Sequence, residues 1–145
     1  MSRDLIVERE VFIAASPETV FGFLIDPGLM ARWIGEQHEL DPHPGGIFRV
    51  ALREAVASGT YEEIVPYRRV AFTWGWEGRD DLPPGRSLVE IELEPKDGGT
   101  LLRLRHSGLA REALAPFTPE EHGKRWAYYL SRLAEQCILP EWRKS

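Results

Sequence analysis

The sequence predicts an α+β fold in which an antiparallel sheet of about six to seven strands wraps around a long C-terminal helix. Three observations support this prediction. Period-two segments between Gly and Pro turns fill the middle of the chain, two helix start signals follow the first strand, and an amphipathic stripe runs near the end. The chain has 145 residues, the length of one ordinary domain, so we expect a single domain over residues 1–145.

The N-terminal part predicts one strand and two short helices. β-branched residues and a period close to two predict a strand from about Leu5 to Ala14. Ser16 can accept a backbone hydrogen bond, and Pro17 lacks an N–H that the first helical turn would leave unpaired, so a helix is expected to begin there. Asp26 and Pro27 repeat this signal and predict a second short helix, which extends towards Trp33.

A meander of strands is predicted between the short helices and the final helix. The pattern changes to period two after Gly35 and is interrupted by turns rich in Gly and Pro. The predicted strands lie near Gln37–Leu40, Gly46–Leu52, Ala57–Val65, Arg69–Trp76, Arg86–Glu94 and Thr100–Ser107.

The last two of these strands form a hairpin whose register follows from their alternation. A two-residue type I′ turn at Asp97-Gly98 would bring the apolar residues of both strands onto one face. The opposed pairs are then Glu92 with Arg103, Glu90 with Arg105, Ile91 with Leu104 and Val89 with His106. A loop centred on Gly98-Gly99 would shift the partners and keep the faces. In both cases the Glu and Arg side chains face water, and His106 faces the covered side.

The final helix begins at a capping box. Thr118 is the expected N-cap, Pro119 occupies the first helical position, and Glu121 stands where it can reach back to the cap. An apolar stripe follows at spacings of four, three and four residues, formed by Trp126, Leu130, Leu133 and Cys137. Pro140 is expected to end or kink this helix.

Composition excludes several classes of protein. The net charge of −5 and the pI near 5.4 argue against nucleic-acid binding, which needs clustered Lys and Arg. The sequence contains no apolar run of the roughly 20 residues that a membrane span requires. Its one cysteine cannot form an intramolecular disulfide, so we expect a protein of the reducing cytoplasm. No cofactor is expected, and a homodimer stays open.

Motifs in a characteristic order extend over nearly the whole chain. They are Ser16-Pro17-Glu18-Thr19-Val20-Phe21, Asp26-Pro27 with Trp33, Pro44-Gly45-Gly46 with Phe48, Gly59 with the strand to Pro66, Val70 to Trp74, and His122 with Trp126, Leu130 and Leu133. Their order and spacing resemble the START-like helix-grip superfamily, also called SRPBCC. Within it, the chain is most similar to the branch homologous to the activator of Hsp90 ATPase.

The resemblance implies a deep cavity between the concave face of the sheet and the last helix. It also implies a ligand that is a lipid, a polyketide or another hydrophobic molecule. Some superfamily members are polyketide cyclases, and the eukaryotic relatives of this branch are co-chaperones. The family often has Gly immediately before the Trp of the last helix, whereas this chain has Arg125. We therefore expect either a helix slightly farther from the sheet or an arginine that points to solvent.

Aromatic residues are the main candidates for ligand contact, because they combine a large apolar area with, in Trp, an N–H that can orient a ligand. Phe72, Trp74 and Trp76 share one strand face. Plain core packing is the competing interpretation for each of them. The full set of candidate ligand-binding residues is Trp33, Phe48, Phe72, Trp74, Trp76, His106 and Trp126.

His106 is the leading polar candidate, either as a structural histidine with its hydrogen bonds satisfied or as a general acid or base. Glu63 would have a raised pKa if it faced the cavity, but its parity leaves both orientations open. The histidines lack the spacing of a zinc site, so no metal is predicted. Residues 77–87 and 108–117 are candidate segments for control of access to the cavity.

These observations predict binding of a small hydrophobic ligand between the sheet and the C-terminal helix, with no defined chemistry and no catalytic residue. Two alternatives stay open. One is a polyketide cyclase-like or hydrolase-like enzyme that uses His106, and the other is a protein-interaction module similar to the Hsp90 activators.

Overall fold

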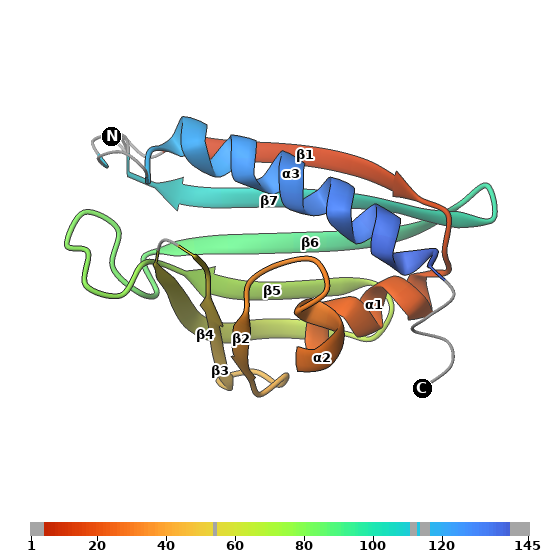
Figure 1. Ribbon diagram of the computed structural model, residues 1–145, viewed down its shortest axis with the longest axis horizontal. Coiled ribbons are helices and arrows are strands. Elements are labelled where there is room, and N and C mark those ends of the chain that lie inside the picture. Colours follow the sequence, from red (N-terminus) through yellow and green to blue (C-terminus); the bar gives the residue numbers. More distant parts are fainter. Residues whose placement is uncertain (1–4, 54, 111–112, 114–116, 140–145) are drawn as a thin grey trace.

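The computed structural model describes residues 5–53, 55–110, 113 and 117–139, and in these ranges it contains one antiparallel sheet and three helices. The strands are β1 Leu5–Ile13, β2 Gln37–Leu40, β3 Ile47–Ala51, β4 Val56–Val65, β5 Arg69–Trp74, β6 Ser87–Lys96 and β7 Gly99–Leu109. The helices are α1 Pro17–Ile25, α2 Pro27–Met30 and α3 Pro119–Cys137. The strand order is β1-β7-β6-β5-β4-β3-β2 (Figure 1). The predicted fold class and element order are thus confirmed.

The helix start signals act as the sequence predicts. The Ser16 hydroxyl accepts a hydrogen bond from the backbone N–H of Thr19 at 3.2 Å, and the Asp26 carboxylate accepts one from Leu29 at 3.1 Å. At α3, Thr118 is the N-cap, and its hydroxyl accepts from the N–H of Glu121 at 3.1 Å. Each cap satisfies a backbone donor that the first helical turn would otherwise leave unpaired.

The ends of α2 and β5 differ from the prediction in a way that affects two candidate residues, Trp33 and Trp76. Helix α2 ends at Met30, and the residues up to Trp33 form turns. Strand β5 ends at Trp74, and Trp76 lies beyond it in an isolated bridge with Ala57. The cause is local, because the backbone N–H of Trp76 donates to the carbonyl of Leu82 at 2.7 Å instead of continuing the ladder.

The hairpin between β6 and β7 has the predicted register. Asp97 and Gly98 both have positive φ, at 48° and 79°, as a type I′ turn requires. The observed partners include Glu92 with Arg103, Glu90 with Arg105, Ile91 with Leu104, and Val89 with His106. The charged side chains therefore lie on the outer face, and His106 is fully buried on the inner face.

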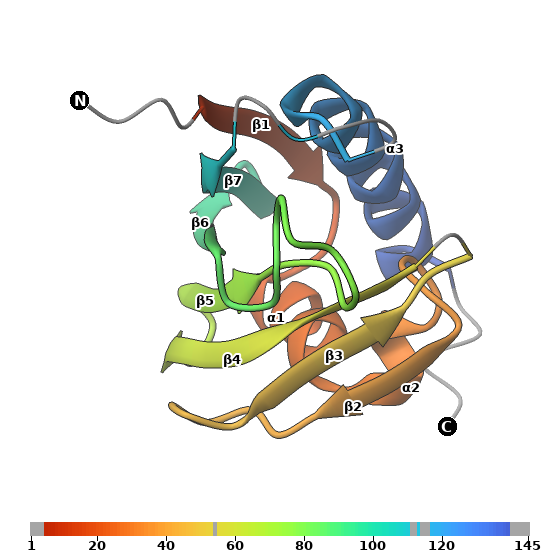
Figure 2. The ribbon, with the colours of Figure 1, turned by 90° about the vertical axis from the view of Figure 1, so that its left-hand side faces the viewer.

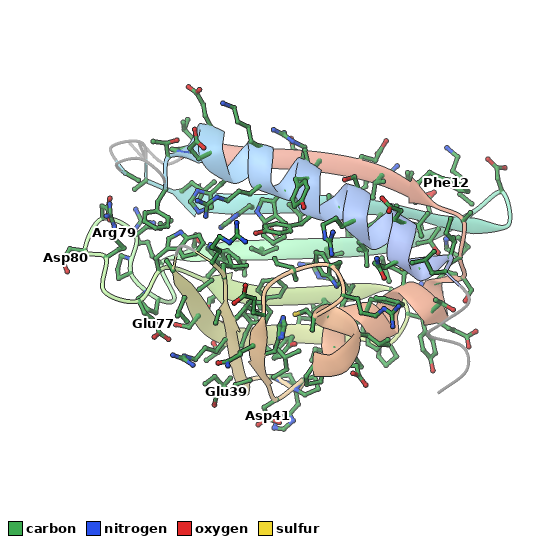
Figure 3. The ribbon with its side chains drawn as sticks, in the orientation of Figure 1. Phe12, Glu39, Asp41, Glu77, Arg79 and Asp80 are labelled. Carbon is green, nitrogen blue, oxygen red and sulfur yellow. The ribbon has the colours of Figure 1, made fainter. Side chains whose placement is uncertain are left out.

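The sheet curves from β1 round to β2, and the helices lie on its concave side (Figure 2). Helix α3 packs mainly on β1 and also contacts α1. Gly123 permits this close approach, because a Cβ there would overlap the Arg9 guanidinium and touch Val7 at 3.6 Å. Between α3 and the strands from β3 to β6, the space is filled by side chains (Figure 3). No helix among the described residues is long and apolar enough to cross a membrane.

Candidate functional site

Large aromatic side chains from β3, β5 and α3 meet on the concave face of the sheet. Phe48 stacks on Phe72 with 3.9 Å between ring centroids, and the Trp74 ring lies 5.3 Å from the rings of Trp76 and Trp126. Six of the seven candidate residues are thus brought together, and each is 3% exposed or less. We call this set the aromatic cluster: Phe48, Phe72, Trp74, Trp76, His106 and Trp126.

Trp33 lies apart from the aromatic cluster. Its indole Nε1 donates to the carbonyl of Phe23 at 2.9 Å, a buried hydrogen bond that fixes the ring against α1. Among the described residues no ring contact joins Trp33 to the cluster, and its side chain borders a groove on the surface instead.

His106 is held by hydrogen bonds on both ring nitrogens. Trp126 can only donate, so its Nε1 donates to Nδ1 of His106 at 2.9 Å. The proton of the neutral ring is therefore on Nε2, which donates to the Ser87 hydroxyl at 2.8 Å. Ser87 in turn donates to the Trp74 carbonyl at 2.8 Å. Burial, with a smaller contribution from His122, lowers the pKa of His106 well below the ordinary 6.5.

His122 repeats this arrangement one turn before Trp126. Nε1 of Trp76 donates to Nε2 of His122 at 3.0 Å, so the ring proton is on Nδ1, which donates to the Thr118 carbonyl at 2.9 Å. Burial is the main reason that the pKa of His122 is lowered. His122 is not among the candidate residues predicted from the sequence, although its position four residues before Trp126 on the apolar side of α3 is a usable signal.

The indole N–H of Trp74 differs from those of the neighbouring tryptophans in its hydrogen bonding. Trp33, Trp76 and Trp126 each donate their indole N–H to an acceptor, whereas Nε1 of Trp74 is buried and has no hydrogen-bond partner among the described residues. An unpaired buried N–H costs about 1–3 kcal/mol, so such groups are uncommon in folded proteins.

The interior contains a small void where the sequence analysis expected a deep cavity. Its volume is about 10 Å³, close to the space of a single water molecule. The void is lined by Ile34, Leu52, Trp74, Trp76, His122, Arg125, Trp126 and Tyr129. The expectation of an open cavity is therefore wrong for this structure, because the rings of the aromatic cluster pack against one another and fill the concavity.

A surface groove of about 490 Å³ adjoins this void. Three residues line both spaces and separate them: Ile34 after α2, Leu52 after β3, and Tyr129 on α3. Ile34 and Leu52 are buried, and Tyr129 is half-buried. We call these three residues the gate, because no other described residue lines both spaces.

Glu63 points away from the aromatic cluster. A β-bulge between Tyr61 and Glu63 breaks the alternation of β4, so Tyr61 is buried while Glu62 and Glu63 are both exposed. On the outer face, Glu63 forms an ion pair with Arg69. The alternative of an inward carboxylate is therefore excluded.

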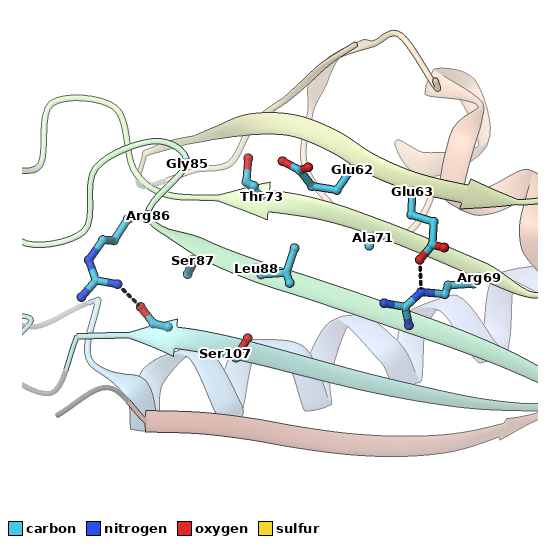
Figure 4. Close-up of a pocket in the computed structure, with 11 residues that line it drawn as sticks. Glu62, Glu63, Arg69, Ala71, Thr73, Gly85, Arg86, Ser87, Leu88 and Ser107 are labelled. Carbon is cyan, nitrogen blue, oxygen red and sulfur yellow. Dashed lines mark hydrogen bonds and ion pairs between the residues drawn. The ribbon is translucent and has the colours of Figure 1, made fainter. Parts of the chain in front are cut away.

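The convex face of the sheet has a wider depression of about 590 Å³ (Figure 4). Small residues of β5 to β7, including Ala71, Thr73 and Ser107, form its floor, with Arg69 and Arg86 at its ends. Arg86 donates to the Gly108 carbonyl at 2.9 Å. The depression is open to solvent and has none of the buried aromatic lining of the cluster, so it is a poorer candidate for binding an apolar ligand.

The segments proposed to control access are only partly described. Phe117 packs on Trp76 with 4.6 Å between centroids, and the Arg79 guanidinium lies 4.8 Å from the Phe117 centroid, so these residues close the end of the cluster near the start of α3. Residues 111–112 and 114–116 lie outside the described residues. In the described part of the chain, no group of three or more His, Cys, Asp and Glu is arranged to hold a metal.

Comparison with known proteins places this architecture in a family. The family model for "Activator of Hsp90 ATPase homolog 1-like protein" matches residues 14–137. A search of curated proteins found no match. Among solved structures, the AHSA1-like protein from Rhizobium etli is 40% identical, with 94% of this chain and 84% of that chain covered and a TM-score of 0.67.

Two further solved structures are similar to this chain. The Aha1 dimer from Colwellia psychrerythraea has a TM-score of 0.80 at 16% identity, with 93% of this chain and 97% of that chain covered. CalU16 from Micromonospora echinospora has a TM-score of 0.66 at 28% identity, with 97% of this chain and 79% of that chain covered. The likeness to the Colwellia protein shows the fold alone. On the strength of the family match over residues 14–137, the chain belongs to the family of activator of Hsp90 ATPase homolog 1-like proteins.

Proposed function

We propose that this protein binds a small, mainly apolar molecule in the aromatic cluster, and that the interior opens at the gate to admit it. The observation that carries the proposal is the buried Nε1 of Trp74, which lacks an acceptor and belongs to a ring that lines the internal void. A ligand with a carbonyl or ether oxygen would supply that acceptor and recover the cost of the unpaired donor.

The arrangement of the layers supports an opening on the side of the gate. Helix α3 packs mainly on β1, whereas Trp126 and Tyr129 on its other flank line the internal void. Displacement of Tyr129 would join the void to the groove of about 490 Å³. That volume is in the range of small-molecule sites, about 300–1,000 Å³.

The neutral hydrogen-bonded histidines also fit a binding role. His106 and His122 each use both ring nitrogens, so they orient Trp126 and Trp76 and leave these ring faces as apolar walls. The enzyme alternative receives no support from this geometry, because a general base needs a free ring nitrogen within reach of a substrate. No described contact favours the protein-interaction alternative. A cytoplasmic location and a homodimer stay predictions.

A matched pair of ligands tests the proposal. Acetonaphthone and ethylnaphthalene have nearly the same size, and only the ketone has a hydrogen-bond acceptor. Isothermal titration should show one ligand per chain, with the ketone bound several-fold more tightly, because one net hydrogen bond contributes about 1 kcal/mol.

The variant Trp74→Phe keeps an aromatic ring and removes the N–H. It should bind ethylnaphthalene as well as the wild type does and should lose the preference for the ketone. Absence of binding for both compounds would refute a site in the aromatic cluster. A ketone preference that survives in Trp74→Phe would refute the role of this indole.

A further inference from the structure

The rim of the gate gathers positive charge in a protein whose net charge is −5. On α3, Arg125, Tyr129 and Arg132 follow at spacings of four and three residues, so they lie in one row along the helix. Arg125 lines the internal void, Arg132 lines the surface groove, and Tyr129 lines both. The row therefore follows the path from the groove into the aromatic cluster.

Arg53 adds a third guanidinium from the opposite side of the groove, in the connection between β3 and β4. Among the described residues that line the void and the groove, Glu36 is the only one with a carboxylate, whereas three have a guanidinium: Arg53, Arg125 and Arg132. The charged side chains that line this mouth are thus mainly positive, opposite in sign to the net charge of the whole chain.

Three arginines elsewhere on the surface of the described chain have carboxylate partners. Arg49 pairs with Glu77 at 2.7 Å, Arg103 pairs with Glu10 at 3.0 Å, and Arg69 pairs with Glu63 and Glu90. By contrast, no carboxylate in the described ranges forms an ion pair with Arg53 or Arg132. Arg132 instead donates to the backbone carbonyl of Arg32 at 3.0 Å, which holds its side chain beside the groove.

Arg125 stands at the boundary between the apolar and the charged part of this path. Its guanidinium lies 5.5 Å from the Trp76 ring and 5.6 Å from the Phe117 ring. These contacts are of the cation–π type and keep the charge against the aromatic wall. A guanidinium in this position can also bind a carboxylate through two parallel hydrogen bonds.

Resting on the proposed function, we infer that the ligand is an amphipathic organic acid. Its apolar ring system lies in the aromatic cluster, and its carboxylate remains at the gate, where Arg53, Arg125 and Arg132 neutralise it. The combination of a dry aromatic interior and a cationic mouth selects this class over neutral lipids, which would leave Arg53 and Arg132 without an anion, and over inorganic anions, which would leave the cluster unused.

Naphthylacetate and naphthylacetamide separate the inference from the proposed function, since they differ only in a carboxylate and an uncharged amide. We expect the acid to bind at least about ten-fold more tightly at low ionic strength, and the preference to shrink with added salt as the ion pairs are screened. In Arg53→Gln and Arg132→Gln, which alter only the surface groove, affinity for the acid should fall about two- to five-fold in each, while affinity for the amide stays unchanged.

Arg105→Gln is the matched control, because it removes the same charge from the exposed outer face of β7. It should leave the preference for the acid intact. Circular dichroism spectra confirm that each variant is folded before titration.

The possible outcomes are distinct. If neither compound binds, the proposed function fails. If both bind with equal affinity, the proposed function stands and the inference of an acidic ligand is overturned. A preference for the acid that survives in the double variant of Arg53 and Arg132, or that disappears in Arg105→Gln, would place the carboxylate elsewhere and would also overturn the inference.

Discussion

Mild acid should destabilise this fold through its two buried histidines. Both His106 and His122 have a pKa lowered from 6.5, mainly because burial disfavours the charged ring. Below about pH 6.5 the unfolded chain takes up protons that the folded chain does not, so the free energy of unfolding falls as the pH falls. The contribution is complete above the unfolded pKa and is lost progressively below it.

The magnitude follows from the slope for a group that titrates only in the unfolded state, about 1.4 kcal/mol per pH unit. For His106 alone, this gives a loss of about 2 kcal/mol between about pH 6.5 and about pH 5. His122 contributes in the same direction. This window lies above the ordinary range of Asp and Glu, so carboxylates contribute little to the change.

Urea unfolding followed by tryptophan fluorescence at several pH values measures this slope. His106→Gln offers an acceptor to Trp126 and a donor to Ser87 without a titrating ring, so its free energy of unfolding should fall less steeply with pH than that of the wild type. His43→Gln is the control, because the His43 ring is exposed and pairs with Asp41 at 3.0 Å. Equal slopes for His106→Gln and the wild type would refute the assignment of a neutral buried His106.

Three further outcomes are expected. Trp126→Phe should lower the free energy of unfolding by about 1–3 kcal/mol, because Nδ1 of His106 loses its donor, and an unchanged urea midpoint would contradict this. Gly59→Ala should destabilise the protein, because the added Cβ would overlap a backbone carbonyl of β5. Gly22→Ala in α1 should stabilise it by up to about 1 kcal/mol, because the added Cβ meets only an ordinary contact at 3.5 Å. Thermal melts that rank the two variants in the reverse order would count against the packing described here. Burial raises the pKa of the Cys137 thiol to about 12, so the thiol should resist Ellman's reagent in the native protein and react on unfolding, and rapid native labelling would contradict its burial.

The elements were predictable because their signals are local. The caps at Ser16, Asp26 and Thr118 need only a side chain and a backbone N–H a few residues away. The register of the last hairpin followed from two alternating strands and one turn, which leave a single consistent pairing of faces.

The candidate site was only partly predictable, because it is formed by contacts between residues that are far apart in the sequence and by the packing of their side chains. Alternation indicates which face of the sheet Trp74 and His106 occupy. It does not indicate how tightly the rings from β3, β5 and α3 fill the concave side, so the prediction of an open cavity was wrong. The orientation of Glu63 depended on a bulge that the residues of β4 do not reveal. The gate combines residues of three elements, which no local pattern joins.

Arg125 differs from both outcomes that the sequence predicts for it. Its departure from the Gly that the family often has at this position predicts either a displaced helix or an arginine directed to solvent. The side chain is half-buried, and its guanidinium lies over Trp76. The close approach of α3 to β1 is made instead at Gly123, two residues earlier.

The indole N–H signal of Trp74 in a proton–nitrogen correlation spectrum tests the central claim most directly. During titration with acetonaphthone, this signal should move to lower field as the unpaired donor gains an acceptor, while that of Trp33, already bonded to the Phe23 carbonyl, should stay in place. A Trp74 signal that remains unmoved when the ligand is bound would contradict the claim that the aromatic interior opens to receive it.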